Sequence, residues 1–375
     1  MPAETPQGVP ESIVFQSFTG LKNTVDRGKL GPRDLAVAVN VDLDDEGQPH
    51  RRRGYTQMAT GNFHSLFEAS DGTVYGVKNG DLGIIEQDYA FTILQANTAG
   101  EHNDGDPNIS YWQIGNSIYF TAPYCSGIIT HSTGLVSPWG PAQSFWYSPV
   151  VDPSSTLPAI AGKLYGEPPR ASALAYYNGR LYLGAGKMLW ATVFNLYTLV
   201  DKTRGFIQFE DDITMVAVVS DGLYVGTTEG IWFLGGASFE KLQRRRVMDS
   251  PVVPGSLVYI PSELANPPGV GPSYRPNPEM EVSVAFMTTR GFCVGGDGGR
   301  CSNLTEADFF FPVARRAPAF FRRQDGMNHY VCCMQTDGPP VNGARSGDFV
   351  DPTIQRGNAL WVDVSETAKA RESYT

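Results

Sequence analysis

The hydrophobic pattern of the chain is built on a short phrase in which a glycine-bearing turn is followed by an apolar, an aromatic and another apolar residue. Such a phrase predicts a tight turn that feeds a β-strand with alternating faces. Because the phrase recurs, it predicts an array or a propeller of similar units. It occupies residues 71–75, 115–120, 178–183 and 221–225, and more loosely residues 290–294 and 325–330.

The spacing of the phrase favours a β-propeller. Three of the intervals between successive copies are near the roughly 40 to 50 residues of a four-stranded blade. Further short runs of β-branched and aromatic residues lie before and after the phrase, as at residues 109–114 and 82–85. We therefore predict an all-β fold, a β-propeller of about five to seven blades. A β-sandwich with irregular hairpins is the alternative.

The two longer intervals hold the most proline-rich parts of the chain, at about residues 131–170 and 262–280. Proline cannot donate a ladder hydrogen bond, so we expect long loops inserted into blades there. The predicted organisation is an N-terminal extended arm and first strand at residues 1–58, the propeller at 59–365 and a C-terminal tail at 366–375. A strand at residues 359–364 is expected to help close the ring.

One blade allows a sharper expectation about packing. Leu181, Tyr182, Leu183 and Trp190 belong to two neighbouring predicted strands. We expect these four side chains to pack together in that blade.

Composition narrows the possible functions. The formal net charge of −10 argues against general nucleic-acid affinity, which depends on neutralising phosphates. No apolar run approaches the length of about 18 residues that a membrane-spanning helix needs. The first twelve residues are polar and lack the basic and apolar regions of a signal peptide, so we expect synthesis in the cytoplasm without export.

The sequence contains no complete motif for binding a metal or a cofactor. The five cysteines form no Cys-x-x-Cys pair, and we expect them to act as small buried hydrophobes, with neighbouring Cys332 and Cys333 on opposite strand faces. Residues 42–53 begin like a calcium loop, but Arg53 stands where the bidentate Glu is needed. Residues 103–106 could bind calcium, although a solvated turn is favoured. We predict no metal and no cofactor.

Catalytic motifs are also incomplete. Glu210, Asp211 and Asp212 are adjacent in sequence and lack the opposed placement that acid–base catalysis needs. The glycine-rich residues 295–299 could form an anion-binding nest, but no phosphate-loop helix follows, so a hairpin tip is favoured. No Gly-x-Ser-x-Gly elbow is present. We therefore predict no catalytic residues and no enzymatic activity; a five-bladed glycosidase is a remote alternative.

Arginine clusters stand out against the acidic background. They could dock on acidic neighbours through bidentate pairs, contact a DNA end, or protect exposed strand edges from aggregation. The triplets are Arg51, Arg52 and Arg53, and Arg244, Arg245 and Arg246, with pairs at residues 315–316 and 322–323.

The first part of the chain carries a resemblance. Residues 15–23 read Phe-Gln-Ser-Phe-Thr-Gly-Leu-Lys-Asn, residues 40–41 read Asn-Val, and residues 51–55 read Arg-Arg-Arg-Gly-Tyr. Over about residues 12–85 the chain resembles tailed-bacteriophage virion proteins of the β-propeller type, such as the tail-nozzle and packaged-DNA-stabilisation proteins of short-tailed phages. The shared positions are turn and packing residues, not catalytic ones.

The resemblance implies a non-enzymatic structural subunit of the virion, assembled in the host cytoplasm as part of the tail or head–tail channel. Such a subunit is expected to join a homo-oligomeric ring, dock on other tail or connector proteins and line or close the DNA conduit, with transient contact to packaged DNA. An acidic wall suits a conduit, because a basic wall would hold the phosphates that must pass.

The main alternative is a receptor- or glycan-binding propeller at the tail tip, with Trp112, Trp139, Trp146 or Tyr147 stacking on sugar rings. Under the structural interpretation, the aromatic anchors of the proline-rich segments are instead expected at protein interfaces. The interface candidates are Trp139, Trp146 and Tyr274, together with the arginines at positions 51–53 and 244–246.

Overall fold

The computed structural model describes ten stretches of the chain, and all structural statements below concern them. They are residues 17–37, 41–43, 47–51, 56–96, 108–147, 163–261, 282–307, 314–324, 327–334 and 358–363. The chain divides into two compact units: Met1–Tyr55 with Thr305–Phe310, and Thr56–Leu304 with Phe311–Thr375. The division falls at residues 55/56, and the sequence predicted a boundary at residue 58. No sequence pattern indicated that residues 305–310 would belong to the first unit.

The first unit contains short strands, so the segment expected to be an extended arm has some regular structure. Strand β1 (Gly20–Leu21) pairs in parallel with β2 (Asp34–Leu35), and β3 (Val41–Leu43) pairs antiparallel with β4 (Pro49–Arg51). A 3-10 turn, η1 (Arg27–Lys29), lies between β1 and β2. The hydroxyl of Thr19 donates to the Asp34 carboxylate at 2.8 Å, and this hydrogen bond is the main reason that the pKa of Asp34 is lowered.

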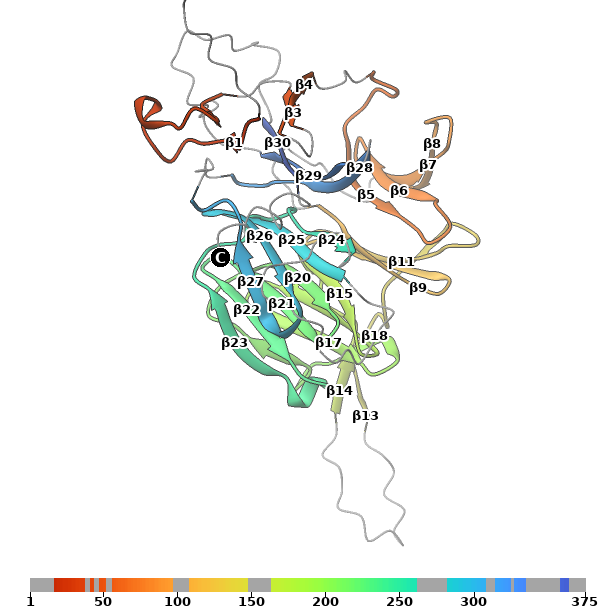
Figure 1. Ribbon diagram of the computed structural model, residues 1–375. Coiled ribbons are helices and arrows are strands. Elements are labelled where there is room, and N and C mark those ends of the chain that lie inside the picture. Colours follow the sequence, from red (N-terminus) through yellow and green to blue (C-terminus); the bar gives the residue numbers. More distant parts are fainter. Residues whose placement is uncertain are drawn as a thin grey trace, which may run out of the picture. The chain divides into compact units, whose positions relative to one another are not determined.

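The second unit is an all-β β-propeller with four clear blades, each a four-stranded antiparallel sheet (Figure 1). Two of them are β5 (Phe63–Glu68), β6 (Val74–Lys78), β7 (Asp81–Ile85) and β8 (Phe91–Gln95), and β9 (Ser110–Ile114), β10 (Ser117–Thr121), β11 (Ser126–Thr130) and β12 (Leu135–Ser137). The other two are β20 (Ile213–Val219), β21 (Gly222–Thr227), β22 (Ile231–Gly235) and β23 (Gln243–Met248), and β24 (Val258–Pro261), β25 (Val282–Thr288), β26 (Gly291–Gly296) and β27 (Arg300–Asn303).

Two further sheets belong to this unit. A seven-stranded sheet contains β13 (Phe145–Tyr147), β14 (Lys163–Gly166), β15 (Ala173–Tyr177), β16 (Arg180–Ala185), β17 (Met188–Val193), β18 (Leu196–Asp201) and β19 (Phe206–Gln208). A three-stranded sheet contains β28 (Ala319–Gln324), β29 (Met327–Met334) and β30 (Asn358–Asp363). Two 3-10 turns complete the unit, η2 (Phe239–Lys241) and η3 (Asp297–Gly299).

The strand predictions made from the phrase are confirmed. Its copies form strands β6, β10, β16, β21, β26 and β29, one in each sheet of the second unit. The strand predicted at residues 359–364 is present as β30, which pairs with β29. Alternation also separates the two neighbouring cysteines as predicted, with Cys332 buried and Cys333 exposed.

The expectation of a long loop at residues 131–170 is wrong for the described part of that segment. Strands β12, β13 and β14 lie within it, and β13 and β14 form a hairpin. The prolines fall between these strands and therefore do not interrupt their hydrogen-bond ladders. The second proline-rich segment, residues 262–280, lies outside the described residues.

The hydrophobic core is divided into clusters that lie between neighbouring sheets. One cluster joins Tyr75 and Leu82 of sheet β5–β8 to Ile118 and Phe120 of sheet β9–β12. Equivalent clusters join β10 to β16, β16 to β20, β21 to β25, and β26 to β29. The four sheets between the first and the last thus each bury two faces against two different neighbours, as the repetition of one supersecondary unit requires.

The tyrosines of the phrase connect the sheets through hydrogen bonds as well as packing. Tyr75, Tyr224 and Tyr330 are fully buried. The hydroxyl of Tyr75 lies 2.8 Å from His131 Nδ1 in the next sheet, and that of Tyr330 donates to the Ser256 carbonyl at 2.6 Å. The hydroxyl of Tyr224 lies 2.6 Å from the Gly296 carbonyl oxygen. Burial raises the pKa of all three phenols, so they stay neutral.

The four residues predicted to pack in one blade do lie in one sheet, on strands β16 and β17, but their side chains occupy both of its faces. Leu181, Leu183 and Trp190 face the sheet that contains β10, whereas Tyr182 faces the sheet that contains β20. The reason is the two-residue period of a strand, which sends Tyr182 to the opposite face from its neighbours.

Removing the Tyr182 ring is expected to destabilise the propeller strongly. The side chain is 1% exposed, so Tyr182→Ala leaves a cavity between two sheets and should cost roughly 3–5 kcal/mol. Urea unfolding followed by circular dichroism measures this loss. A change within experimental error would contradict the position of Tyr182 between the sheets.

Removing only the Tyr75 hydroxyl is expected to cost less. Tyr75→Phe keeps the buried ring but loses the hydrogen bond to His131, so the free energy of unfolding should fall by about 0.5–1.5 kcal/mol. Tyr89→Phe is the matched control, because Tyr89 is 47% exposed and its substitution should leave stability unchanged. Equal effects of the two substitutions in chemical denaturation would show that the hydroxyl does not join the sheets.

Candidate functional site

The second arginine triplet lies on β23, the last strand of its sheet. Arg244, Arg245 and Arg246 are exposed, and they pair in register with Leu234, Phe233 and Trp232 of β22. A β-bulge at residues 231/232 adjusts the register beside them. Because side chains alternate along a strand, Arg244 and Arg246 share one face and Arg245 lies on the other.

Aromatic rings hold the two arginines that share a face. The guanidinium carbon of Arg244 lies 4.8 Å from the centroid of the Trp232 ring and 5.4 Å from that of Phe209. Arg246 lies 5.6 Å from the Trp232 centroid. The Phe209 and Trp232 rings meet edge to face at 6.1 Å. Each cation–π contact of this kind is worth about 0.5–1 kcal/mol at an exposed site.

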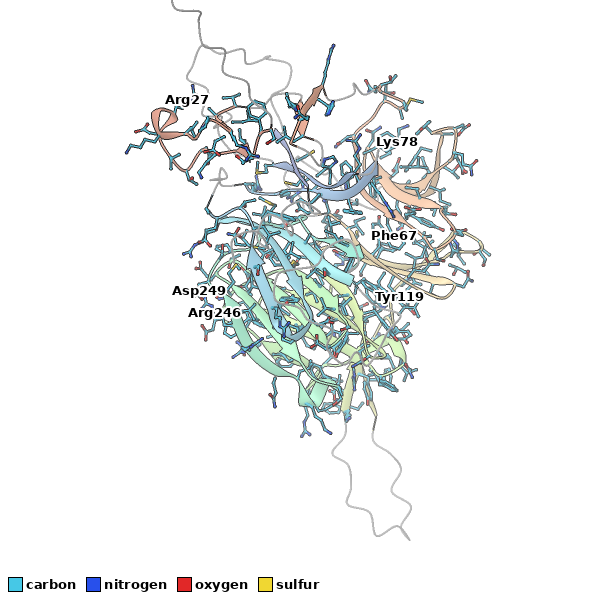
Figure 2. All side chains as sticks on the ribbon, viewed as in Figure 1. Arg27, Phe67, Lys78, Tyr119, Arg246 and Asp249 are labelled. Atoms are coloured by element: carbon cyan, nitrogen blue, oxygen red, sulfur yellow. The ribbon has the colours of Figure 1, made fainter. Side chains whose placement is uncertain are left out.

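Backbone carbonyls fix the same guanidinium groups. Arg244 donates to the Gln208 carbonyl at 3.0 Å, and Arg246 donates to the Glu229 carbonyl at 3.1 Å. Arg246 also forms an ion pair with Asp249, and Figure 2 shows the two side by side at the outer side of the sheet. We call Arg244, Arg246, Trp232 and Phe209 the arginine face.

Arg245 instead joins its sheet to the next one. Its guanidinium donates to the carbonyl oxygens of Gly298 and Gly299 in η3, the turn between β26 and β27. The amide of Gly298 donates in turn to the carboxylate of Asp221 at 2.8 Å. The glycine-rich turn is therefore a hairpin connection, as predicted. The Gly298 amide, which could have belonged to an anion-binding nest, instead binds the Asp221 carboxylate of the same chain.

Asp221 occupies an unusual environment in this contact. Burial is the largest influence on its carboxyl and raises its pKa, and the charge of Asp297 acts in the same direction. The hydrogen bond from Gly298 lowers the pKa but does not cancel these effects. Its second oxygen, Oδ1, is buried and has no hydrogen-bond partner within the described part of the chain.

A second polar group joins the sheets β5–β8 and β9–β12. His131 lies between the Tyr75 hydroxyl, 2.8 Å from Nδ1, and the Asp71 carboxylate, 3.0 Å from Nε2. Asp, His and a hydroxyl are the residue types of an acid–base relay. Here the hydroxyl belongs to a fully buried side chain whose pKa is raised by burial, so the arrangement holds two sheets together.

Trp139 differs from the expectation that it anchors a neighbouring protein. Its side chain is only 2% exposed, and its indole N–H donates to the Tyr197 carbonyl at 2.8 Å. The ring also packs against Tyr119, with centroids 5.3 Å apart. Trp139 is consequently part of the core of its own chain and unavailable to a partner or a sugar.

Trp146 lies in the opposite situation, on the exposed strand β13. It is 67% exposed and its neighbour Phe145 is 43% exposed. Strand β13 is the last strand of the seven-stranded sheet, where it pairs with β14. The structure thus leaves two large aromatic side chains accessible on one short edge strand.

The remaining candidates are only partly described. Arg51 is exposed on β4. Arg52, Arg53 and Tyr274 lie outside the described residues, as does the side chain of Tyr147. The first arginine triplet therefore stays a prediction.

The inner strands bring together three aromatic residues that the sequence did not single out as a group. Trp112 of β9 stacks on Tyr176 of β15 with centroids 6.4 Å apart, and meets Tyr259 of β24 edge to face at 6.0 Å. The Tyr259 hydroxyl also accepts from the Val218 amide at 3.3 Å. Strands from four different sheets therefore meet around these rings.

Two searches for other kinds of site gave no candidates. Within the ten described stretches, no group of three His, Cys, Asp or Glu side chains could hold a metal ion. In the same part of the chain, no helix is long and apolar enough to cross a membrane.

Asp221 gives a testable pH dependence. Its folded-state pKa lies above the usual 3.8, so its contribution to stability is complete below that pH and is lost as the pH rises through the folded-state value. In Asp221→Asn the side chain cannot ionise, so the variant does not lose stability in this way. The free energy of unfolding of the variant minus that of the wild type should therefore rise from pH 3 to about pH 7. Urea unfolding across that range measures it, with Asp212→Asn, an exposed position, as the control. A difference that stays constant with pH would contradict the raised pKa.

Comparisons with known proteins agree with the fold and give no family. No known protein-family model matches the chain, and no curated protein does. Among solved structures, the extracellular domain of a protein described as a hybrid two-component system from B. thetaiotaomicron is similar, with 12% identity and a TM-score of 0.43. That match covers 76% of this chain and 33% of the bacterial one, so this chain spans about a third of that protein.

Two propellers of other origin are also similar. The N-terminal domain of Nup159 has 5% identity and a TM-score of 0.41 and covers 72% of each chain. The β-propeller domain of Cps50 (Swd1) from Myceliophteria thermophila has 9% identity and a TM-score of 0.39, over 74% of this chain and 94% of that one. The chain thus has a β-propeller fold similar to distant propeller domains.

Proposed function

We propose that this protein is a non-enzymatic structural subunit of a bacteriophage virion, located in the tail or head–tail channel and docked on neighbouring tail or connector proteins. The observation that carries the proposal is the exposed aromatic pair Phe145 and Trp146 on β13. Aromatic residues dominate the binding energy of protein interfaces, and exposed pairs of this kind are costly to leave in water.

The position of this pair supports docking. Hairpin β13–β14 is an addition to its sheet that the four clear blades lack. It is joined to β18 through β14 alone, so it extends the sheet outward at its outer end. A partner can therefore cover Phe145 and Trp146 without disturbing the packing between the sheets.

We further propose that the propeller is a closed ring of six blades, within the predicted range of five to seven. Core clusters link the sheets in chain order from β5–β8 to β28–β30. The seven-stranded sheet contributes a blade from β15–β18, and β28–β30 contribute the last one. Contact between the last sheet and β5–β8 would complete the ring.

The aromatic group of Trp112, Tyr176 and Tyr259 limits where a DNA conduit can run. Because strands from several sheets meet around these contacting rings, we expect no room for duplex DNA along the axis of one propeller. A conduit in the proposed assembly is therefore formed between several copies arranged in a ring. The net charge of −10 suits a wall along which DNA slides without being held.

The phage assignment itself is supported by the sequence resemblance over about residues 12–85. The described part of that segment contains strands β1 to β7. Its motif residues include Gly47, whose φ of +75° and close approach to the Phe18 backbone explain why glycine is needed there.

A receptor- or glycan-binding propeller at the tail tip is the second candidate, and the exposure of Trp146 favours it as well. An exposed indole can stack on a sugar ring as readily as on a protein side chain. The two proposals differ in what the isolated chain does. A glycan binder retains affinity for host surface glycans by itself, whereas an assembly subunit acquires its contacts only on the connector.

The double substitution Phe145→Ser with Trp146→Ser tests the docking proposal. Both side chains are exposed, so the purified variant should keep its melting temperature, but its copy number in phage particles should fall at least tenfold. Mass spectrometry of purified particles measures the copy number. Phe194→Ser is the matched control, since Phe194 is 57% exposed in the turn between β17 and β18.

Two outcomes would contradict the proposal. Normal incorporation of the double variant would show that β13 is not a docking surface. Absence of the wild-type protein from purified particles would remove the virion role altogether, and retained binding to host glycans by the isolated chain would favour the tail-tip alternative.

A further inference from the structure

The outer edge of β23 is open in the described part of the chain. The sheet ends at β23, and no other described strand pairs with it. Residues Gln243 to Arg246 are exposed along this edge. Peptide groups on an open edge can pair with an extended segment of another protein, which adds a strand to the sheet.

The arginine face beside this edge includes one arginine, Arg244, whose charge is not paired within the described part of the chain. No carboxylate within the described residues forms an ion pair with Arg244. An arginine has five N–H donors, and Arg244 uses one of them in its hydrogen bond to Gln208. Arg246 is paired with Asp249, but the Asp249 side chain is 75% exposed and can be displaced toward water.

Stacking prepares both arginines for binding an anion. Trp232 and Phe209 hold the guanidinium planes, and the Gln208 and Glu229 carbonyls fix one donor of each. Folding has therefore already immobilised these arginine side chains. Binding an anion then costs them little further conformational entropy. Their remaining donors match the geometry of a carboxylate.

We propose that β23 binds an acidic, extended segment of a partner protein, which pairs with the open edge and places carboxylates opposite Arg244 and Arg246. These two arginines are two residues apart on one strand, so they match acidic residues at alternate positions of the added strand. The inference rests on the proposed function, because it names the chemistry of a docking partner. DNA offers no peptide groups to the edge and would use the arginines alone.

Peptide binding to the whole purified chain tests the proposal. The probe is a fluorescent ten-residue peptide of alternating Glu and Thr, measured by anisotropy at low and at physiological salt. The matched peptide has the same composition, with five Glu followed by five Thr. The alternating peptide should bind at least fivefold more tightly, and hydrogen exchange of the β23 amides should slow when it binds.

Substitutions then locate the binding. Arg244→Gln with Arg246→Gln should weaken the alternating peptide at least tenfold, and Arg290→Gln, at an exposed turn, should leave it unchanged. If the glutamine variant unfolds, the double variant Arg244→Lys with Arg246→Lys replaces it in the experiment. The lysine variant should weaken peptide binding by less than tenfold, because it keeps the positive charge and loses only the planar stacking.

Three outcomes would overturn the inference. Equal binding of the two peptides would show general charge attraction, and tighter binding of a 20-base-pair DNA duplex would assign the arginines to nucleic acid. Absence of peptide binding to the wild type would leave the arginines as protection of a strand edge. If the wild type fails to bind peptide yet enters particles in a Trp146-dependent way, this inference fails while the proposed function stands.

Discussion

The burial of aromatic residues between neighbouring sheets is the interaction on which the rest of the propeller depends. A four-stranded sheet has two apolar faces and cannot cover them alone. Tyr75, Tyr224 and Tyr330 each cover such a face with a ring that buries on the order of 150–250 Å². Their hydroxyls then donate to or accept from groups in the adjacent sheet, so the same residue supplies apolar burial and fixes the register between sheets.

The sequence predicted the strands well because turn chemistry and the two-residue period are local properties. It could not predict which sheet each face would meet. Trp139 shows the reason: its position among prolines is typical of a loop, but its indole donates to a carbonyl 58 residues further along the chain. In the same way the arginine triplet was evident as charge, whereas only the fold brings Trp232 of β22, and Phe209 just after β19, against its arginines Arg244 and Arg246.

The glycine-rich turn at residues 295–299 illustrates how tertiary structure decides the use of a local motif. Successive glycines permit the positive φ angles of Gly298 and Gly299, +69° and +67°, and allow amides to converge on an anion. In this protein the anion is the Asp221 carboxylate of the neighbouring sheet, and Arg245 binds the carbonyls on the other side of the turn. A motif that could have held a ligand instead joins two sheets, at the cost of a partly buried carboxyl with a raised pKa.

This division between inner and outer strands constrains any role of the protein. The inner strands are occupied by one another, since β9 packs against β15, β15 against β20 and β24 against β28. Polar side chains between the sheets form hydrogen bonds and ion pairs with one another, as Tyr75, His131 and Asp71 do. Within the described part of the propeller, two surfaces that a partner can reach lie on the last strands of their sheets, where β13 presents aromatic rings and β23 presents stacked arginines. One surface is suited to apolar burial and the other to charge and backbone pairing, so a subunit that uses both can distinguish two different neighbours.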